Sequence, residues 1–205
     1  MPPTALPDPA THEAAELARL TATLTTFGLH LRPEDHWQAD ELAMLAEALA
    51  DLLRAARWSP GACTAALGGP ITVLRDRSGP LTTDAAGTRY PVLGLYDTTQ
   101  RLLTVNDWSF DAQVGGEANG RRVLLHELAH AWDHRAAHLL SLVIGWLPGP
   151  QASGYARNSR FEDWADAVMG AVYGADPGHE AFDRTAAGRP SWRLRYVRWA
   201  FARYR

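Results

Sequence analysis

Lysine is absent from this 205-residue chain, and cysteine occurs only once. The 20 positively charged side chains are all arginine, and together with 23 acidic residues they give a formal net charge of −3. This acidic balance argues against a dedicated nucleic-acid binder. The single cysteine, Cys63, cannot form an internal disulfide, so the fold does not require an oxidising compartment. We expect Cys63 to be a small buried apolar residue.

Long hydrophobic runs are also missing. The most apolar stretch, residues 139–147, is far shorter than the roughly 20 residues needed to cross a bilayer. The first eight residues have neither the basic region nor the apolar region of a signal peptide. We therefore expect a soluble protein that is cytoplasmic by default. No pattern indicates an oligomeric state.

Hydrophobic periodicity predicts helices, then a small sheet, then further helices, which is typical of the α+β class. The predicted helices span residues 11–27, 38–57, 121–138 and 159–173, and the predicted strands span 71–74, 92–96 and 101–105. The last two strands form a hairpin, so we expect a small, mostly antiparallel sheet. We divide the chain into an N-terminal helical segment, 1–60, and a main domain, 61–205, packed as one compact unit.

Residues 126–130 read His-Glu-Leu-Ala-His, an HExxH motif. On a helix, His126 and His130 present their imidazoles on one face, with Glu127 beside them. The flanking residues are mostly apolar, so the helix should be largely buried. Two buried imidazoles and a carboxylate need a partner to offset several kcal/mol of desolvation. The motif therefore predicts a zinc ion on the two histidines and a general base at Glu127, as in a small zinc peptidase.

The four-residue spacing continues at His134 and His138. On an unbroken helix, His126 and His134 would lie about 12 Å apart along the axis. One ion with bonds of about 2 Å cannot span that separation. We therefore exclude His134 as a ligand and expect His134 and His138 to be polar residues of the surface or of a cleft.

A catalytic zinc site usually needs a third protein ligand. Glu162 and Asp166 lie four residues apart on a predicted helix and so share a face. Glu162 can bind the metal while Asp166 accepts the free N–H of a ligating histidine. The alternative for such residues is a solvated acidic face, which we expect for Asp163. The pair His179-Glu180 is a weaker source of the third ligand.

Three features together resemble the gluzincin metallopeptidases, most closely the branch that contains the anthrax lethal factor catalytic domain and the Pro-Pro endopeptidases. They are the run His126-Glu-Leu-Ala-His-Ala-Trp-Asp133, Tyr155 seven residues before Glu162, and the run Glu162-Asp-Trp-Ala-Asp-Ala-Val168. The resemblance covers roughly residues 71–174, about half of the chain, and only the motifs are specific.

The resemblance implies a minimal zincin-like fold, in which the sheet packs on the HExxH helix and on the glutamate-bearing helix. It also implies that His126, His130 and Glu162 bind zinc. Glu127 is then the general base, and Tyr155 stabilises the oxyanion.

The hairpin 92–105 resembles the family's edge strand, which lies over the cleft and against which an extended protein or peptide substrate lies. Two positions depart from the family pattern. Asp163 stands where an aromatic residue is usual, and Asp166 stands where glutamate is usual. Because aspartate is shorter, the helix of Asp166 must lie closer to the metal, or a water must bridge the gap.

Two functions other than catalysis are open to the same motif. One is a proteolytically idle zinc-binding regulator or peptide-binding protein that uses the cleft for recognition. The other is a structural zinc site, which would need a fourth protein ligand. The intact Glu127 favours an active enzyme, because an idle relative has no need of the base.

The C-terminal run, residues 189–205, interleaves six arginines with aromatic residues. It predicts a terminal helix in which Trp192, Tyr196, Trp199 and Arg203 pack on the core, with arginine stems covering apolar surface. The alternative is a patch for nucleic acid or an anionic membrane.

Overall fold

The computed structural model describes residues 9–83, 87–111, 113, 119–149, 151–153, 155–174 and 192–204. The α-helices in these ranges are α1 (Pro9–Thr26), α2 (Ala39–Ala56), α3 (Pro60–Ala66), α5 (Asn119–Arg135), α6 (Leu139–Ile144), α7 (Arg160–Tyr173) and α8 (Trp192–Arg203). The strands are β1 (Leu29–Leu31), β2 (Ile71–Asp76), β3 (Leu81–Thr83), β4 (Arg89–Pro91), β5 (Gly94–Asp97) and β6 (Leu102–Asn106). Short 3-10 helices are η1 (Pro33–Asp35), η2 (Asp107–Ser109) and η3 (Tyr155–Asn158).

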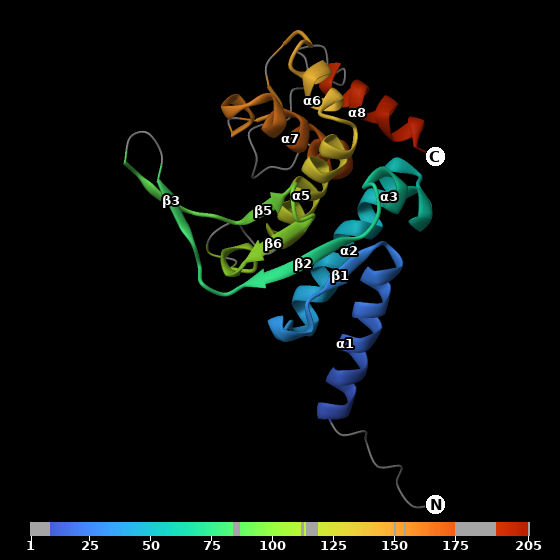
Figure 1. The fold of residues 1–205 in the computed structure, drawn as a ribbon, viewed down its shortest axis with the longest axis vertical. Coiled ribbons are helices and arrows are strands. Elements are labelled where there is room, and N and C mark those ends of the chain that lie inside the picture. The colour runs from blue at the N-terminus through green and yellow to red at the C-terminus, as the bar shows by residue number, and fades with distance from the viewer. Residues whose placement is uncertain are drawn as a thin grey trace, which may run out of the picture.

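Four strands form one mixed sheet in the order β1-β2-β6-β5 (Figure 1). The pairs β1–β2 and β2–β6 are parallel, and only β5–β6 is antiparallel. The α+β class is therefore confirmed, but the expected mostly antiparallel sheet is wrong. Parallel neighbours need a long crossover, which α2 and α3 provide between β1 and β2. The three-residue strand β1 is too short to show periodicity, so the sequence reading missed it.

Alternating burial shows which face of the sheet packs on the helices. Along β2, Ile71 and Val73 are fully buried, and Val73 pairs with the buried Leu103 of β6. Helix α5 packs on β5 and β6, α7 packs on α5, and α8 packs on α7. Helix α5, which carries the HExxH motif, therefore lies between the sheet and α7.

The N-terminal segment shares this core. Strand β1 pairs with β2, helix α1 packs on α2, and α2 contacts both α5 and α7. Arg75 of β2 and Glu41 of α2 form a buried ion pair, with Nη2 and Oε1 2.5 Å apart. Trp58 donates from Nε1 to the carbonyl of Phe201 at 2.7 Å, which links the N-terminal segment to α8.

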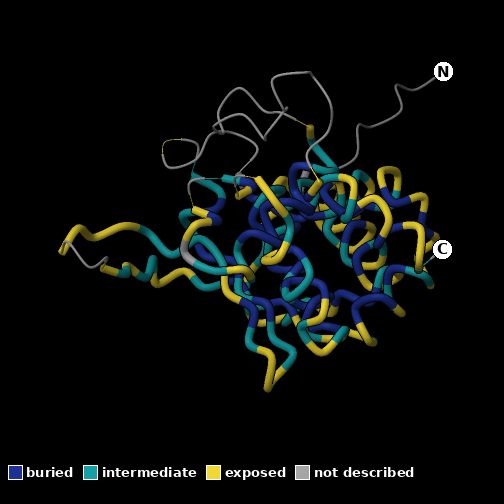
Figure 2. The backbone as a smooth tube through the Cα atoms, turned by 90° about the horizontal axis from the view of Figure 1, so that it is seen from above, coloured by how far each residue is buried: buried dark blue, intermediate teal, exposed yellow. Residues whose placement is uncertain are grey.

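The predicted hairpin is present as β5 and β6, and β5 is the edge strand of the sheet among the described residues. A second hairpin, β3–β4, precedes it and projects from the body of the molecule (Figure 2). None of the described residues of β3 and β4 is buried. The sequence reading did not identify this hairpin, because its strands have only three residues each.

The helix predicted over 121–138 ends earlier, at Arg135. Ala137 and His138 both adopt the left-handed conformation, with φ of 53° and 61°, and a separate helix, α6, begins at Leu139. His138 therefore does not continue the helical stripe of His126, His130 and His134. The prediction failed because no glycine or proline marks the break.

The C-terminal helix forms as predicted, but with a different buried face. Its buried residues are Arg193, Val197, Ala200 and Phe201. Trp192 and Trp199, which were expected in the core, are 55% and 56% exposed. Arg193 is buried because it forms an ion pair with Asp163 of α7, and this pairing turns a different face of α8 toward the core. No helix in the described part of the chain is both long and apolar enough to span a bilayer.

Candidate metal centre

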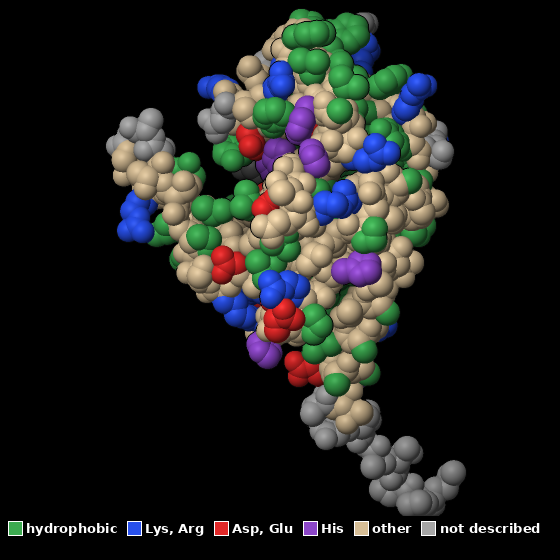
Figure 3. Space-filling view, in the orientation of Figure 1, with side chains coloured by type: hydrophobic (Ala, Val, Ile, Leu, Met, Phe, Trp, Pro, Cys, Tyr) green, Lys and Arg blue, Asp and Glu red, His purple; other side chains and the backbone are tan. Residues whose placement is uncertain are grey.

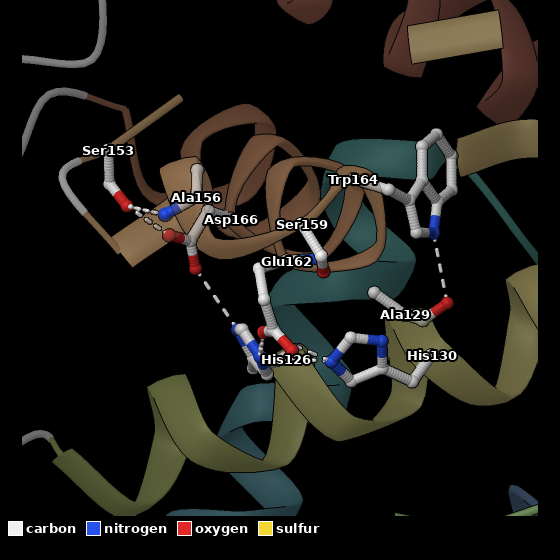
Figure 4. Close-up of polar contacts among 9 residues, drawn as sticks. All are labelled: His126, Ala129, His130, Ser153, Ala156, Ser159, Glu162, Trp164 and Asp166. Atoms are coloured by element: carbon white, nitrogen blue, oxygen red, sulfur yellow. Dashed lines mark hydrogen bonds and ion pairs between the residues drawn. The ribbon is translucent and has the colours of Figure 1, made fainter. Parts of the chain in front are cut away.

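Helices α5 and α7 lie side by side and carry the candidate ligands (Figure 4). A buried hydrogen bond joins them, from Trp164 Nε1 to the carbonyl of Ala129 at 2.9 Å. The first turn of α7 is capped by Ser159, whose hydroxyl accepts the N–H of Glu162 at 3.2 Å. These contacts fix Glu162 opposite the HExxH residues.

The side chains of His126, His130 and Glu162 converge on one point and could hold a metal ion. His126 Nε2 lies 2.8 Å from Glu162 Oε2 and 3.0 Å from His130 Nε2. His130 Nε2 lies 3.4 Å from the same carboxylate oxygen. The sequence prediction thus selected the three residues that the fold brings together, although Glu162 is 36 positions from His126.

The chemistry of these atoms fits a cation. The carboxylate of Asp166 can only accept, so Nδ1 of His126 carries a proton, and Nε2 is the ring atom that the neutral imidazole would offer to a metal. Nε2 faces a carboxylate oxygen of Glu162 at 2.8 Å, so either a proton on Nε2 or a cation must lie between the two atoms. Zinc bonds of about 2 Å in a tetrahedral arrangement place ligand atoms about 3.3 Å apart. The observed separations of 2.8 to 3.4 Å are close to this value.

Electrostatics at the site also favour positive charge. Burial disfavours a charged His126, but its hydrogen bonds to Asp166 and Glu162 outweigh this and raise its pKa to about 10. Burial likewise opposes ionisation of Glu162, yet hydrogen bonds from His126 and His130 lower its pKa to about 2. A protonated His126 thus supplies positive charge beside the ionised Glu162, and a metal ion would bind in place of the proton on Nε2.

Asp166 accepts a hydrogen bond from the ring of His126, as the sequence predicted. Its Oδ1 lies 3.0 Å from His126 Nδ1, so the shorter acid reaches the ring directly without a bridging water. Its other oxygen accepts the hydroxyl proton of Ser153 (Figure 4). Ser153 in turn accepts the N–H of Ala156 at 3.0 Å. Both oxygens of Asp166 are thus engaged, which fixes the His126 tautomer.

Glu127 is buried beside the histidines, under strand β5. Burial raises its pKa, while His126, His130 and a backbone hydrogen bond from Tyr96 act in the opposite direction. Gly94 of β5 makes this close packing possible. A Cβ at Gly94 would lie 2.6 Å from Val123 Cγ1 and 3.0 Å from Glu127 Oε1. Only glycine therefore allows the strand to approach the motif helix so closely.

A cleft of about 310 Å³ opens over these residues. In Figure 3, histidine side chains gather beside the hollow that separates the projecting strands from the helical body. The cleft is lined by Gly94, Leu95, Tyr96, Thr98, His126, Glu127, His130, Asp133, His138, Tyr155, Phe161 and Glu162. Strand β5 forms one wall, and α5 and the start of α7 form the others.

Tyr155 lies at the mouth of this cleft on η3, with its ring centroid 5.9 Å from that of His126. Burial, together with the negative charges of Glu162, Glu127 and Asp166, raises its pKa to about 12. Tyr155 therefore keeps its phenolic proton at neutral pH and can donate a hydrogen bond into the cleft.

Asp163 corrects one prediction. It was expected on a solvated face, but it is 2% exposed and paired with Arg193. The hydrophobic periodicity cannot reveal this, because the partner comes from a distant helix. Cys63, in contrast, is buried as predicted, and burial raises the pKa of its thiol to about 12.

His138 lines the cleft, and the metal-binding group does not include His134. His138 donates from Nδ1 to Oδ2 of the buried Asp133 at 3.2 Å. Asp133 also accepts the N–H of Ser141 at 2.9 Å. The fallback pair His179-Glu180 lies outside the described residues.

Sequence reasoning missed three residues that shape the site: Gly94, Ser153 and Arg193. An isolated glycine inside a strand is a signal of close backbone approach, so Gly94 could have been found. Ser153 and Arg193 have no local signal, because their roles depend on tertiary contacts. No protein-family model, curated protein or solved structure matches the chain.

Proposed function

We propose that the protein is a zinc-dependent endopeptidase of the gluzincin type, resembling the lethal factor and Pro-Pro endopeptidase branch. One observation carries the proposal: the convergence of His126, His130 and Glu162 in a cleft that also contains the buried carboxylate of Glu127. A structural zinc site has no need of a carboxylate base at the edge of an open cleft.

When bound, zinc lowers the pKa of a coordinated water toward about 7 and polarises the scissile carbonyl. Glu127 then accepts a proton from the attacking water and passes it to the leaving amine. Burial raises the pKa of Glu127, which makes its carboxylate a stronger base than an exposed glutamate. Asp166 holds the His126 ring in the tautomer that leaves Nε2 free.

Tyr155 serves as the oxyanion donor. Its elevated pKa, about 12, keeps the hydroxyl protonated while negative charge develops on the substrate oxygen. An extended peptide lies along β5, whose outer edge is open among the described strands and whose Leu95 is 59% exposed. Main-chain hydrogen bonds to that edge would align the scissile bond with Glu127.

The test pairs metal analysis with cleavage of a peptide library. Glu127→Gln removes the base but leaves all three ligands intact, so it should retain zinc and lose hydrolysis by at least about 100-fold. Retained turnover in this variant would remove the general-base assignment. Zinc binding by the unaltered chain without any chelator-sensitive cleavage would favour the idle peptide-binding alternative.

A further inference from the structure

A buried ion pair ties the C-terminal helix α8 to the metal-binding helix α7. Arg193 Nε lies 2.9 and 2.8 Å from the two carboxylate oxygens of Asp163, and the two side chains are 5% and 3% exposed. Asp163 directly follows the candidate ligand Glu162. Arg193 also donates from Nη1 to the carbonyls of Pro148 and Gly149, both at 3.3 Å. One guanidinium therefore connects α8, α7 and residues 148–149.

Asp163 also forms a hydrogen bond with the segment 151–153, which contacts the helix of the candidate ligand Glu162. Oδ1 of Asp163 accepts the N–H of Ala152 at 2.8 Å. The next residue is Ser153, whose hydroxyl donates to Asp166, and Asp166 accepts from Nδ1 of His126 at 3.0 Å. An unbroken series of buried or half-buried polar contacts thus runs from α8 to the ring of a candidate ligand.

We propose that Arg193 is a positioning residue for the metal centre, acting through Asp163, Ala152 and Ser153 on the Asp166–His126 contact. The proposal rests on the metal site proposed above. Its physical basis is that Ser153 donates its one hydroxyl proton to Asp166, and the backbone that positions this hydroxyl follows Ala152, whose N–H Asp163 accepts. Arg193 contacts the segment before Ser153 at two points, through Asp163 at Ala152 and directly at the carbonyls of Pro148 and Gly149.

Arg193→Lys tests the proposal, because lysine keeps the charge but cannot hold Asp163 and both carbonyls with one planar fork. The measurement is zinc affinity, by competition with a chromophoric chelator. Residues behind a metal ligand typically contribute about 10- to 100-fold in affinity, so we expect about a tenfold loss. Arg198→Lys is the matched control, because Arg198 is exposed on the same helix. It should bind zinc as the unaltered chain does.

A double-mutant cycle separates positioning from general stabilisation. If Arg193 acts through Ser153, then Arg193→Lys should change zinc affinity by less than about twofold in a Ser153→Ala background. Equal losses in both backgrounds, or no loss in either, would overturn the proposal. The metal-free unfolding midpoint is measured in all four proteins. A lower midpoint with unchanged affinity would show that Arg193 only stabilises the fold, which also overturns it.

Should Arg193→Lys fail to fold, Asp163→Asn interrupts the same series with a single changed atom and takes its place in the cycle. The affinity readout is independent of peptide cleavage. A chain that binds zinc and shows the cycle, but cleaves no peptide, would contradict the endopeptidase and leave the positioning role standing. A chain that cleaves peptides but shows additive losses would contradict only the positioning role.

Discussion

Replacing Gly94 by alanine should separate catalysis from metal binding. The added Cβ would lie 2.6 Å from Val123 Cγ1, and 3.0 Å from both Cγ and Oε1 of Glu127. Real Cβ atoms do not approach other heavy atoms to 2.6 Å, so β5 or the Glu127 side chain must move. The three candidate ligands are not among these nearest contacts, so the displacement acts on the base and on the strand.

The size of the effect follows from the geometry. Removing the 2.6 Å contact requires a shift of about 1 Å, and overpacking of this kind typically costs about 1–3 kcal/mol in unfolding free energy. A misplacement of about 1 Å in a reacting group can lower turnover by about 100-fold. We therefore expect Gly94→Ala to lose about two orders of magnitude in kcat while its zinc affinity changes by less than about threefold.

The assay compares kcat, zinc affinity and urea unfolding for Gly94→Ala and a control glycine variant. Gly61→Ala serves as that control, because a Cβ there meets only Ser59 Oγ, at 4.0 Å. It should match the unaltered chain in kcat and zinc affinity. Full turnover by Gly94→Ala would refute the reasoning, since it would show that the close contact between β5 and Glu127 has no part in the reaction.

Three further predictions concern single side chains. Because burial raises the pKa of Cys63 to about 12, its thiolate is nearly absent at pH 8, and a disulfide reagent should label it only after denaturation; labelling of the folded chain would contradict this. His138 lines the cleft but forms its hydrogen bond with Asp133, not with a candidate ligand, so His138→Ala should raise KM about tenfold and leave zinc affinity unchanged. An unchanged KM would show that the substrate does not contact His138. Trp58→Phe removes the shorter of two hydrogen bonds to the carbonyl of Phe201, which also accepts the N–H of Tyr204 at 3.4 Å, and should lower the urea-unfolding free energy by about 1 kcal/mol. An unchanged midpoint would show that the bond from Trp58 contributes nothing.

The candidate site could be predicted because its information is local. His126, Glu127 and His130 lie within one helical turn and a half, so the fixed geometry of a helix places them together without any knowledge of the fold. Glu162 and Asp166 follow the same rule on the second helix. His126 and Glu162 are 36 positions apart, and periodicity does not predict that they meet. That contact was predicted from the family resemblance and from the third protein ligand that a catalytic zinc site requires.

The rest depended on contacts that no local pattern encodes. A three-residue strand such as β1 gains its stability from its neighbour β2, and so the parallel pairing was missed. The buried face of α8 was misjudged because aromatic residues were expected inside and arginine outside. Arg193 is nevertheless inside, because the buried carboxylate of Asp163 needs a partner of opposite charge.

Candidate ligands drawn from two separate helices would link metal supply to the stability of the folded chain. An ion bound by α5 and α7 together would stabilise only the folded state, because the unfolded chain does not bring His126 and Glu162 together. At a free metal concentration about 1,000 times Kd, this contributes about 4 kcal/mol to the unfolding free energy. Scarcity of the ion would then do more than halt a reaction: it would leave the chain open to degradation, so that the amount of protein falls together with its cofactor.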